Sequence, residues 1–251
     1  MAHETLVTRQ FESAAEGYRE SPVHAQGADL AVFRARAEER TPRAALDVGA
    51  GTGHVAFTIA PFCQVVHAVD ASPAMLAILT AEATARGLTQ VQVHEAQAAA
   101  LPVPDASMDL VTCRYNAHHW HRLDAGLAEI ARVLRPDGLF VLTDALGSAT
   151  ALVDTHLQAL ELLRDPSHVR DHDQAQWIAA LARAGLSVTR SETTRVRLDL
   201  DSWLARAHTP PERALVIRAL LADAPEEVRA ALTIEVDAFW LDVLTCEARK
   251  A

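Results

Sequence analysis

Three glycines alternate with other residues in a short run that can bring a ligand against the main chain. The run 49–53 (GAGTG) follows the apolar segment 44–48 (AALDV) and precedes a helical pattern. Glycines let the backbone turn sharply and let a ligand approach it closely. A dinucleotide-binding fold favours the spacing GxGxxG, but His54 stands in the place of its last glycine. The spacing therefore favours a nucleoside joined to an amino acid over a pyrophosphate.

An acid follows where the next apolar segment ends. Asp70 closes the run 65–69 (VVHAV) and lies 17 residues after Gly53. A carboxylate at this position can accept hydrogen bonds from both ribose hydroxyls of an adenosine. The position would also suit NAD, and a helix cap is an alternative role for Asp70. Together, the glycine run and Asp70 favour an adenosine site over an ordinary tight connection.

Candidate proton-transfer groups follow a third apolar segment, 108–113 (MDLVTC). Tyr115, His118 and His119 lie at its exit. Histidine titrates near neutral pH, so it can take a proton from a hydroxyl, an amine or an acidic carbon. Adjacent residues on a turn point in different directions, and we expect at most one of the two histidines to face a pocket. Packing is the alternative role for each.

Other polar residues fall where a pocket would lie. Asp144 ends the segment 139–144 (LFVLTD), and Tyr18 and His24 belong to the amino-terminal stretch. The run 165–173 (DPSHVRDHD) would suit an anionic substrate or a lid clamp, with a plain polar loop as the alternative. A metal site could draw on His118, His119 and His121, or on His168 and His172, but these groups lack a nearby acidic or cysteine partner at ligand spacing, so we expect no metal site.

The elements that must position these residues are short strands and helices. Apolar segments alternate with helical patterns between residues 44 and 144, which predicts parallel strands joined by crossover helices. Ser72 and Pro73 begin a helix that Gly87 ends. A second helix is expected over 123–134, with its apolar positions on one face and a turn at 135–138 (RPDG) after it.

In order, these segments resemble the motifs of class I S-adenosylmethionine-dependent methyltransferases, especially the ubiquinone and menaquinone biosynthesis branch. The resemblance covers about residues 44–146 and rests on 46–54 (LDVGAGTGH), 69–76 (VDASPAML), 97–105 (QAAALPVPD), 108–120 (MDLVTCRYNAHHW) and 129–140 (EIARVLRPDGLF). It implies S-adenosyl-L-methionine as cofactor and S-adenosyl-L-homocysteine as product. It also implies an α/β, Rossmann-like fold with a mostly parallel seven-stranded sheet, helices on both faces and a helical cover.

The resemblance implies roles for individual residues. Asp70 would hold the ribose, while Ala71 and Met75 would pack around the adenine, with simple core packing as the alternative for Met75. Gln97 replaces an acid that normally contacts the adenine amino group, and its carbonyl can accept the same hydrogen bond, unless it lies in a surface loop. Ala98 would offer its backbone N–H to the ring. The predicted cofactor-binding set is Tyr18, Asp47, Gly49, Ala50, Gly51, Gly53, Asp70, Ala71, Met75, Gln97, Ala98 and Arg114, and the predicted catalytic set is His119, His118 and Tyr115.

Two regions outside the motifs should cover the sheet. Residues 1–43 look helical and form an expected amino-terminal cap, and the Rossmann-like domain would occupy 44–251 with helical lid insertions at about 150–184 and 201–235. The segment 187–198 (SVTRSETTRVRL) between them reads as a strand. The segment 239–248 (FWLDVLTCEA) alternates as a final strand would, although a helix is the alternative.

Composition narrows the class of partner. The 251 residues carry a formal charge of −10 without a basic cluster, which disfavours nucleic acid as a substrate. Three separated cysteines indicate reduced thiols in the cytoplasm. The sequence lacks an apolar signal core and a run long enough for a membrane helix, so no membrane association is expected. The chain should act as a monomer or a homodimer.

These observations favour an enzyme that transfers a methyl group to a carbon, oxygen or nitrogen atom of a small molecule by in-line displacement. A catalytically silent protein that binds S-adenosylmethionine or S-adenosylhomocysteine for regulation is an alternative. An RNA or protein methyltransferase is less favoured because of the acidic balance. An NAD-dependent oxidoreductase is disfavoured by the glycine spacing.

Overall fold

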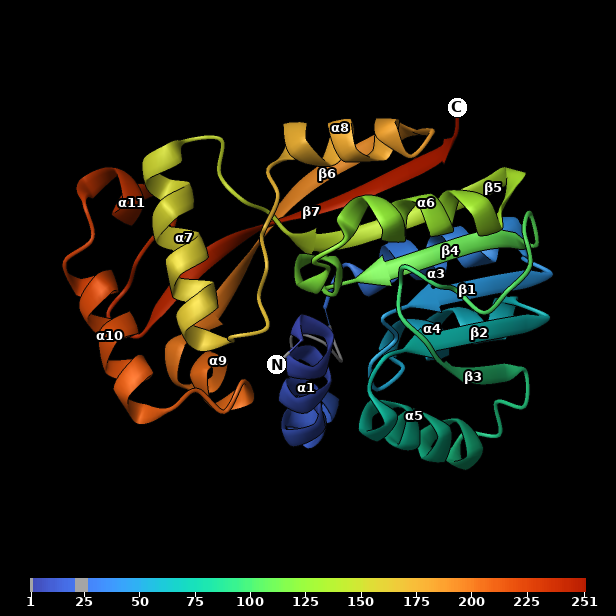
Figure 1. The fold of residues 1–251 in the computed structure, drawn as a ribbon, viewed down its shortest axis with the longest axis horizontal. Coiled ribbons are helices and arrows are strands. Elements are labelled where there is room, and N and C mark those ends of the chain that lie inside the picture. The colour runs from blue at the N-terminus through green and yellow to red at the C-terminus, as the bar shows by residue number, and fades with distance from the viewer. Residues whose placement is uncertain (1, 21–26) are drawn as a thin grey trace.

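A single sheet organises the chain in the computed structural model, which describes residues 2–20 and 27–251. Within that part the strand order is β3-β2-β1-β4-β5-β7-β6, and β7 runs antiparallel to both neighbours while β1 to β5 are parallel (Figure 1). The predicted mostly parallel, seven-stranded sheet is confirmed. The strands are β1 (Ala44–Val48), β2 (Val65–Asp70), β3 (Val91–Glu95), β4 (Met108–Arg114), β5 (Leu134–Ala145), β6 (Leu186–Asp199) and β7 (Ala238–Lys250).

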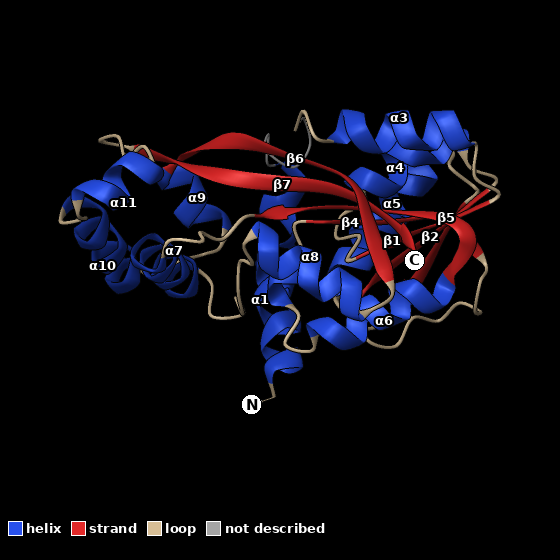
Figure 2. Cartoon of the chain, turned by 90° about the horizontal axis from the view of Figure 1, so that it is seen from above, coloured by secondary structure: helices blue, strands red, loops and turns tan. Residues whose placement is uncertain are grey.

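Helices cover both faces of the sheet, as predicted (Figure 2). One face packs against α3 (Leu30–Arg40), α4 (His54–Ile59) and α5 (Pro73–Ala85), which surround side chains such as Phe33, Ile59 and Leu79. The other face packs against α6 (Leu123–Val133) and α8 (Gln174–Arg183) through Leu127 and Trp177. Short 3-10 turns η1 (Ala60–Phe62) and η2 (Ala117–His119) complete this part.

Local signals explain where several elements begin. Ser72 accepts a hydrogen bond from the N–H of Met75 at 3.4 Å, and Pro73 takes the first helical position, so α5 begins as its sequence predicts. The segment 135–138, predicted as a turn, lies within β5 instead. Leu134 pairs with Met108 of β4, and the next pair is Leu139 with Leu110, so the register shifts between them. Strand β5 therefore starts at Leu134, and residues 135–138 lie between these two pairs. The final segment is a strand, and the helical alternative for 239–248 is wrong.

Strands β6 and β7 continue beyond the sheet and carry a second group of helices (Figure 1). This group, here called the annex, consists of α7 (Ala151–Arg164), α9 (Leu200–Arg206), α10 (Pro211–Ala222) and α11 (Glu226–Ala231). Its helices and the far half of the hairpin share a separate apolar core that includes Leu157, Trp203, Ile217 and Phe239. The predicted lid region 150–184 is therefore divided, because α7 belongs to the annex whereas α8 uses Trp177 to pack on the sheet.

The amino-terminal helix α1 (His3–Glu20) lies between the annex and the sheet (Figure 1). It packs against α5 and contacts α9. Gln10 Nε2 donates to the carbonyl of Ala207 at 2.8 Å, which ties α1 to the end of α9. The helix thus stands over the carboxyl ends of the parallel strands.

Candidate functional site

A cavity opens at the carboxyl ends of β1, β2 and β4 and extends to α1. It has a volume of about 1230 Å³, part of which is open to solvent. Ten of the predicted cofactor-binding residues line it, together with Tyr115 and His119 from the predicted catalytic set. The ten are Asp47, Gly49, Ala50, Gly51, Asp70, Ala71, Met75, Gln97, Ala98 and Arg114.

The turn after β1 and the acid after β2 meet on one side of this cavity. Gly51 has a φ of +53°, and a Cβ placed on it would find no atom within 4 Å, so open space lies over its backbone. Its N–H donates to Asp70 Oδ2 at 2.8 Å, while Ser72 N–H donates to Asp70 Oδ1 at 2.9 Å. Burial raises the pKa of Asp70, against these bonds, which favour its charged form. A carboxylate has about four acceptor sites, so Asp70 keeps acceptor capacity toward the cavity. The bare backbone and this free acceptor capacity fit an adenosyl group.

Gly53 does not line the cavity. A Cβ at this position would lie 2.5 Å from Phe57 and 2.9 Å from Leu79, both of which pack beneath the glycine turn. The absence of a side chain lets α4 approach the neighbouring helix. The structure thus gives Gly53 a packing contact in place of the predicted position in the ligand site.

Asp47 borders the cavity but uses its carboxylate within the fold. It is buried and accepts bonds from Thr112 Oγ1 at 2.9 Å and from Ala56 N–H at 3.1 Å. Burial raises the pKa of Asp47 to about 7, although both bonds act in the opposite direction. Asp47 therefore joins β1 to β4 and to the start of α4, and so holds the glycine turn in place.

The opposite wall of the cavity comes from β2, α5 and the loop after β3. Met75 is buried there, with Ala71 beside it on the same wall, while Gln97 is exposed at the rim next to Ala98. An apolar floor with amide groups at its edge suits an aromatic base.

Arg114 ends β4 with its guanidinium committed to another segment. It is buried, pairs with Asp29 before α3, and lies with Cζ 4.9 Å from the centroid of the Tyr115 ring. Asp29 was missed by sequence reasoning because it lies 85 residues away and belongs to no recognised motif. The pair holds the exit of β4 next to the cavity.

The amino-terminal helix contributes residues that the sequence did not indicate. Phe11 meets the His119 ring edge to face with centroids 4.9 Å apart, and His3 Nε2 lies 3.1 Å from the His119 carbonyl oxygen. Glu4, Val7 and Thr8 also line the cavity. The Tyr18 side chain and His24 lie outside the described residues.

A second cavity adjoins the first. It has a volume of about 600 Å³ and lies between η2, α7, α9 and the far half of the β6–β7 hairpin. Tyr115 and His119 line both cavities, whereas His118 lines only the second. Tyr115 has a φ of +48°, in the left-handed region that non-glycine residues seldom adopt, and burial raises its pKa. This strained residue stands at the junction of the two cavities.

His118 forms a close pair with Asp144 at the end of β5. His118 Nδ1 lies 2.5 Å from Asp144 Oδ1, and His118 N–H donates to Asp144 Oδ2 at 3.1 Å. Asp144 is fully buried. Burial lowers the pKa of His118, but the charge and hydrogen bond of Asp144 outweigh it and raise this pKa to about 9. The ring is therefore an imidazolium at neutral pH.

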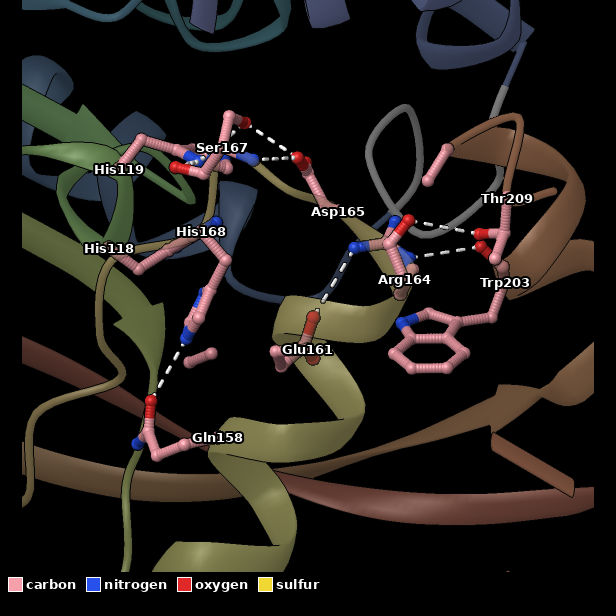
Figure 3. Close-up of polar contacts among 12 residues, drawn as sticks. His118, His119, Gln158, Glu161, Arg164, Asp165, Ser167, His168, Trp203 and Thr209 are labelled. Atoms are coloured by element: carbon pink, nitrogen blue, oxygen red, sulfur yellow. Dashed lines mark hydrogen bonds and ion pairs between the residues drawn. The ribbon is translucent and has the colours of Figure 1, made fainter. Parts of the chain in front are cut away.

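The neighbouring histidines are neutral. Burial and then the charge of His118 lower the pKa of His119 to about 3, and its Nδ1 donates to the Ser167 carbonyl at 3.1 Å. His168 Nε2 donates to Gln158 Oε1 at 2.9 Å (Figure 3). The run 165–173 thus reaches from α7 to η2, and Val169 N–H also donates to the His118 carbonyl at 2.9 Å.

The described residues hold no group of three metal-binding side chains. In the same part of the chain, every helix is too short or too polar to cross a bilayer.

Comparisons with known proteins relate the chain to methyltransferases. Residues 46–142 match the family described as a methyltransferase domain. The chain is 35% identical over 227 residues to the uncharacterized methyltransferase YcgJ of Bacillus subtilis (strain 168), with 90% of each chain covered. It is 40% identical over 124 residues to a demethylmenaquinone methyltransferase of Thermus thermophilus, which covers 47% of this chain and 56% of that one. The structure of the putative methyltransferase BH2331 from Bacillus halodurans C-125 matches with a TM-score of 0.86 and 28% identity over 89% of this chain and 99% of the other.

Proposed function

Because the chain belongs to the class I S-adenosylmethionine-dependent methyltransferases of the ubiquinone and menaquinone biosynthesis type, we propose that it methylates a small molecule bound in the second cavity. The observation that carries this proposal is the pair of adjoining cavities, which have Tyr115 and His119 in common. The first cavity is lined by the residues of the predicted cofactor-binding set, and the second cavity is lined in part by the annex.

In this proposal the first cavity binds the cofactor through the motif residues that line it. Asp70 holds the ribose, the backbone of 49–51 passes beneath the amino-acid portion, and Met75 packs on the adenine. Gln97 and Ala98 meet the adenine edge, and the exit of β4 at Arg114 borders the methionine portion. When bound, S-adenosylmethionine supplies a methyl group on a positively charged sulfur.

The second cavity supports a small acceptor. It has about 600 Å³ of space, part of it open to solvent, between side chains of η2, α7, α9 and the β6–β7 hairpin. Apolar side chains from β6 and β7 form one wall, and charged side chains from η2 and α7 form the other. A polymer would in addition need an extended outer surface, and the charge of −10 disfavours nucleic acid.

The chain's own residues then have to position the two reactants. Tyr115 and His119 lie at the junction, and the Asp29–Arg114 pair ties the end of β4 beside them to the start of α3. Alignment and exclusion of water supply much of the acceleration in a displacement of this kind. We therefore assign the strained Tyr115 backbone to orientation of the acceptor.

The test is incubation with methyl-labelled S-adenosylmethionine and a small-molecule metabolite extract, followed by mass detection. We expect label in a small metabolite, and much less label at the same limiting cofactor concentration when Asp70→Ala replaces the unaltered chain. Binding of S-adenosylhomocysteine without product from any extract would contradict catalysis and favour a regulatory binding protein. Label in tRNA or protein alone would contradict the small-molecule assignment.

A further inference from the structure

Strand β6 forms one edge of the sheet, and its middle is open. β7 pairs with one side of β6 over residues 186–199, and within the described part of the chain no strand pairs with its other side. Residues 189–195 are exposed without interruption, so their side chains are accessible on both faces of the sheet. In Figure 2, helices flank the β6–β7 hairpin on both sides, and none crosses the middle of β6.

The outward main-chain groups of this edge are unpaired. No described residue outside the sheet bonds the main chain of residues 189–195. A bond from α8 to this stretch reaches the side chain of Ser191 instead. A row of unpaired N–H and C=O groups along a strand is a template on which another strand can pair.

The sequence of β6 favours such pairing. The segment 186–199 (LSVTRSETTRVRLD) contains neither lysine nor proline, which commonly block pairing at sheet edges. Its three threonines are β-branched and favour extended backbone. An irregularity between Val188 and Arg190 affects only the first part of the strand, because the ladder to β7 is regular from Arg190 onward. The exposed stretch can therefore accept a further strand.

The charges on this edge complement themselves. Arg190 and Glu192 lie on the same face of β6, with Ser191 between them on the other face. Their side chains are 3.4 Å apart and more than half exposed. If a second copy pairs antiparallel about a twofold axis at Ser191, Arg190 of each copy lies opposite Glu192 of the other. Opposite charges directly across an antiparallel pair stabilise it.

Other registers lack this complementarity. Residues opposite each other in an antiparallel pair point to the same face, so the twofold axis must pass through a residue and not between two. An axis at Arg190, Glu192 or Arg195 places like charges opposite each other. An axis at any of the three threonines brings no opposite charges together. Within 189–195, Ser191 is therefore the centre that the charges select.

Helix α8 adds an apolar side chain beside the edge. Gln174 Nε2 donates to Ser191 Oγ at 3.2 Å, so this side of α8 faces the middle of β6. Ile178 follows four residues later on the same side of the helix and is 46% exposed. A twofold axis at Ser191 brings α8 of both copies to the same face of the joined sheet. The two Ile178 side chains then flank the interface.

We propose that two copies of the chain associate through residues 187–195 of β6, antiparallel and centred on Ser191, so that their sheets become continuous. Main-chain hydrogen bonds supply the attraction, the two Arg190–Glu192 pairs select the register, and Ile178 contributes apolar burial. The formal charge of −10 on each chain opposes approach from a distance. Salt at about 0.15 M screens that repulsion beyond about 8 Å and acts less on charges in contact. The inference does not depend on the proposed function.

Sedimentation equilibrium of the full chain over a wide concentration range tests the proposal, and we expect a reversible equilibrium between one and two copies. Arg190→Glu and Glu192→Arg each set two pairs of like charges across the interface, so each should raise the dissociation constant about tenfold or more. The double variant with both substitutions restores the opposite charges and should return the dissociation constant to within about threefold of the original. A merely structural effect of either substitution would not be repaired in this way.

Matched controls lie on α10, away from the edge. Glu212→Arg reverses an exposed acid there and should leave the dissociation constant unchanged. Ile178→Gln should weaken association, whereas Leu215→Gln, at a side chain that is 69% exposed on α10, should not. Hydrogen exchange supplies a second readout, because amides within 187–195 should exchange more slowly as the protein concentration rises.

Three results would overturn the inference. They are a single copy at every concentration, a dimer that neither charge reversal weakens, and a double variant that stays as weak as the single ones. If a charge variant does not fold, hydrogen exchange of the unaltered chain decides. In that case, exchange within 187–195 that does not depend on concentration overturns the inference.

Discussion

The N–H of Gly51 donates to Asp70 Oδ2 over 2.8 Å, and this bond joins the glycine turn after β1 to the acid that ends β2. The other oxygen of the same carboxylate accepts from Ser72 N–H at 2.9 Å, where α5 begins. A single side chain therefore ties together two loops and a helix start at the edge of the first cavity. Substitution of Gly51 or of Asp70 should therefore change the affinity for the cofactor.

Replacement of Asp70 by alanine should weaken S-adenosylhomocysteine binding by about 10- to 100-fold, because hydrogen bonds to a charged group contribute about 1.5–3 kcal/mol. Titration calorimetry measures the change. Asp124→Ala is the control, since Asp124 is an exposed carboxylate paired with Arg183 on the surface. Equal affinities for the two variants would contradict the assignment of Asp70.

Gly51→Ala and Gly87→Ala form a matched pair. Both glycines have positive φ, +53° and +67°, and a Cβ on either would meet no atom within 4 Å. Each variant should lose about 1–2 kcal/mol of unfolding free energy through left-handed strain. Only Gly51→Ala should also lose cofactor affinity, by about tenfold or about 1.4 kcal/mol, because only Gly51 lines the cavity. An equal effect of both on affinity would place the ligand elsewhere.

Phe11→Ala should speed release of S-adenosylhomocysteine. The ring packs edge to face on His119 and lines the first cavity, and such pairs contribute about 0.5–1.5 kcal/mol. Stopped-flow displacement should show a dissociation rate about two to ten times faster. Thr5→Ala, an exposed position on the same helix, serves as the control. A rate unchanged by Phe11→Ala would show that α1 does not retain the ligand.

The His118–Asp144 pair predicts a stability that falls with rising pH. The folded pKa of His118, about 9, exceeds its ordinary value of 6.5, so the stabilisation is complete below pH 6.5 and is lost as pH rises through 9. The loss amounts to about 3 kcal/mol. Urea unfolding of the unaltered chain and His118→Gln across this range measures it. If the free energy of unfolding changes with pH in the same way in both proteins, the raised pKa of His118 is ruled out.

His119 and His168 act in the opposite direction at low pH. Their folded pKa values of about 3 and about 2 lie below 6.5. Just below pH 6.5, both rings are therefore protonated in the unfolded chain and neutral in the folded chain. Stability should therefore fall by about 1.4 kcal/mol per pH unit for each ring as pH drops below 6.5. His168→Gln should reduce this acid sensitivity in urea unfolding. If the free energy of unfolding of the variant falls more steeply with decreasing pH than that of the unaltered chain, the buried neutral state of His168 is contradicted.

Much of the sheet and most of the lining of the first cavity could be predicted from the sequence, because their signals are local. Buried parallel strands appear as apolar runs, as in 44–48, and Ser72 with Pro73 marks a helix start. The glycine turn and Asp70 belong to neighbouring strands, so topology alone brings them together. Gly53 shows the limit of motif reasoning, since its spacing matched the motif although Phe57 and Leu79 set its packing.

The remainder depends on contacts between distant segments, which leave no local pattern. Arg114 meets Asp29 across 85 residues, and His118 meets Asp144 across 26. The sequence could not tell His118 from His119, because the difference lies in which ring the buried carboxylate reaches. Likewise, α7 and α8 both looked like lid helices, and the packing of Trp177, Ala180 and Leu181 in the sheet core is what distinguishes α8.

A crystal structure of the chain with S-adenosylhomocysteine tests the central claim most directly. The account predicts density for the adenosyl group over Gly51, with both ribose hydroxyls within hydrogen-bond distance of the Asp70 carboxylate. Density for the ligand elsewhere, or a ribose that makes no contact with Asp70, would contradict it.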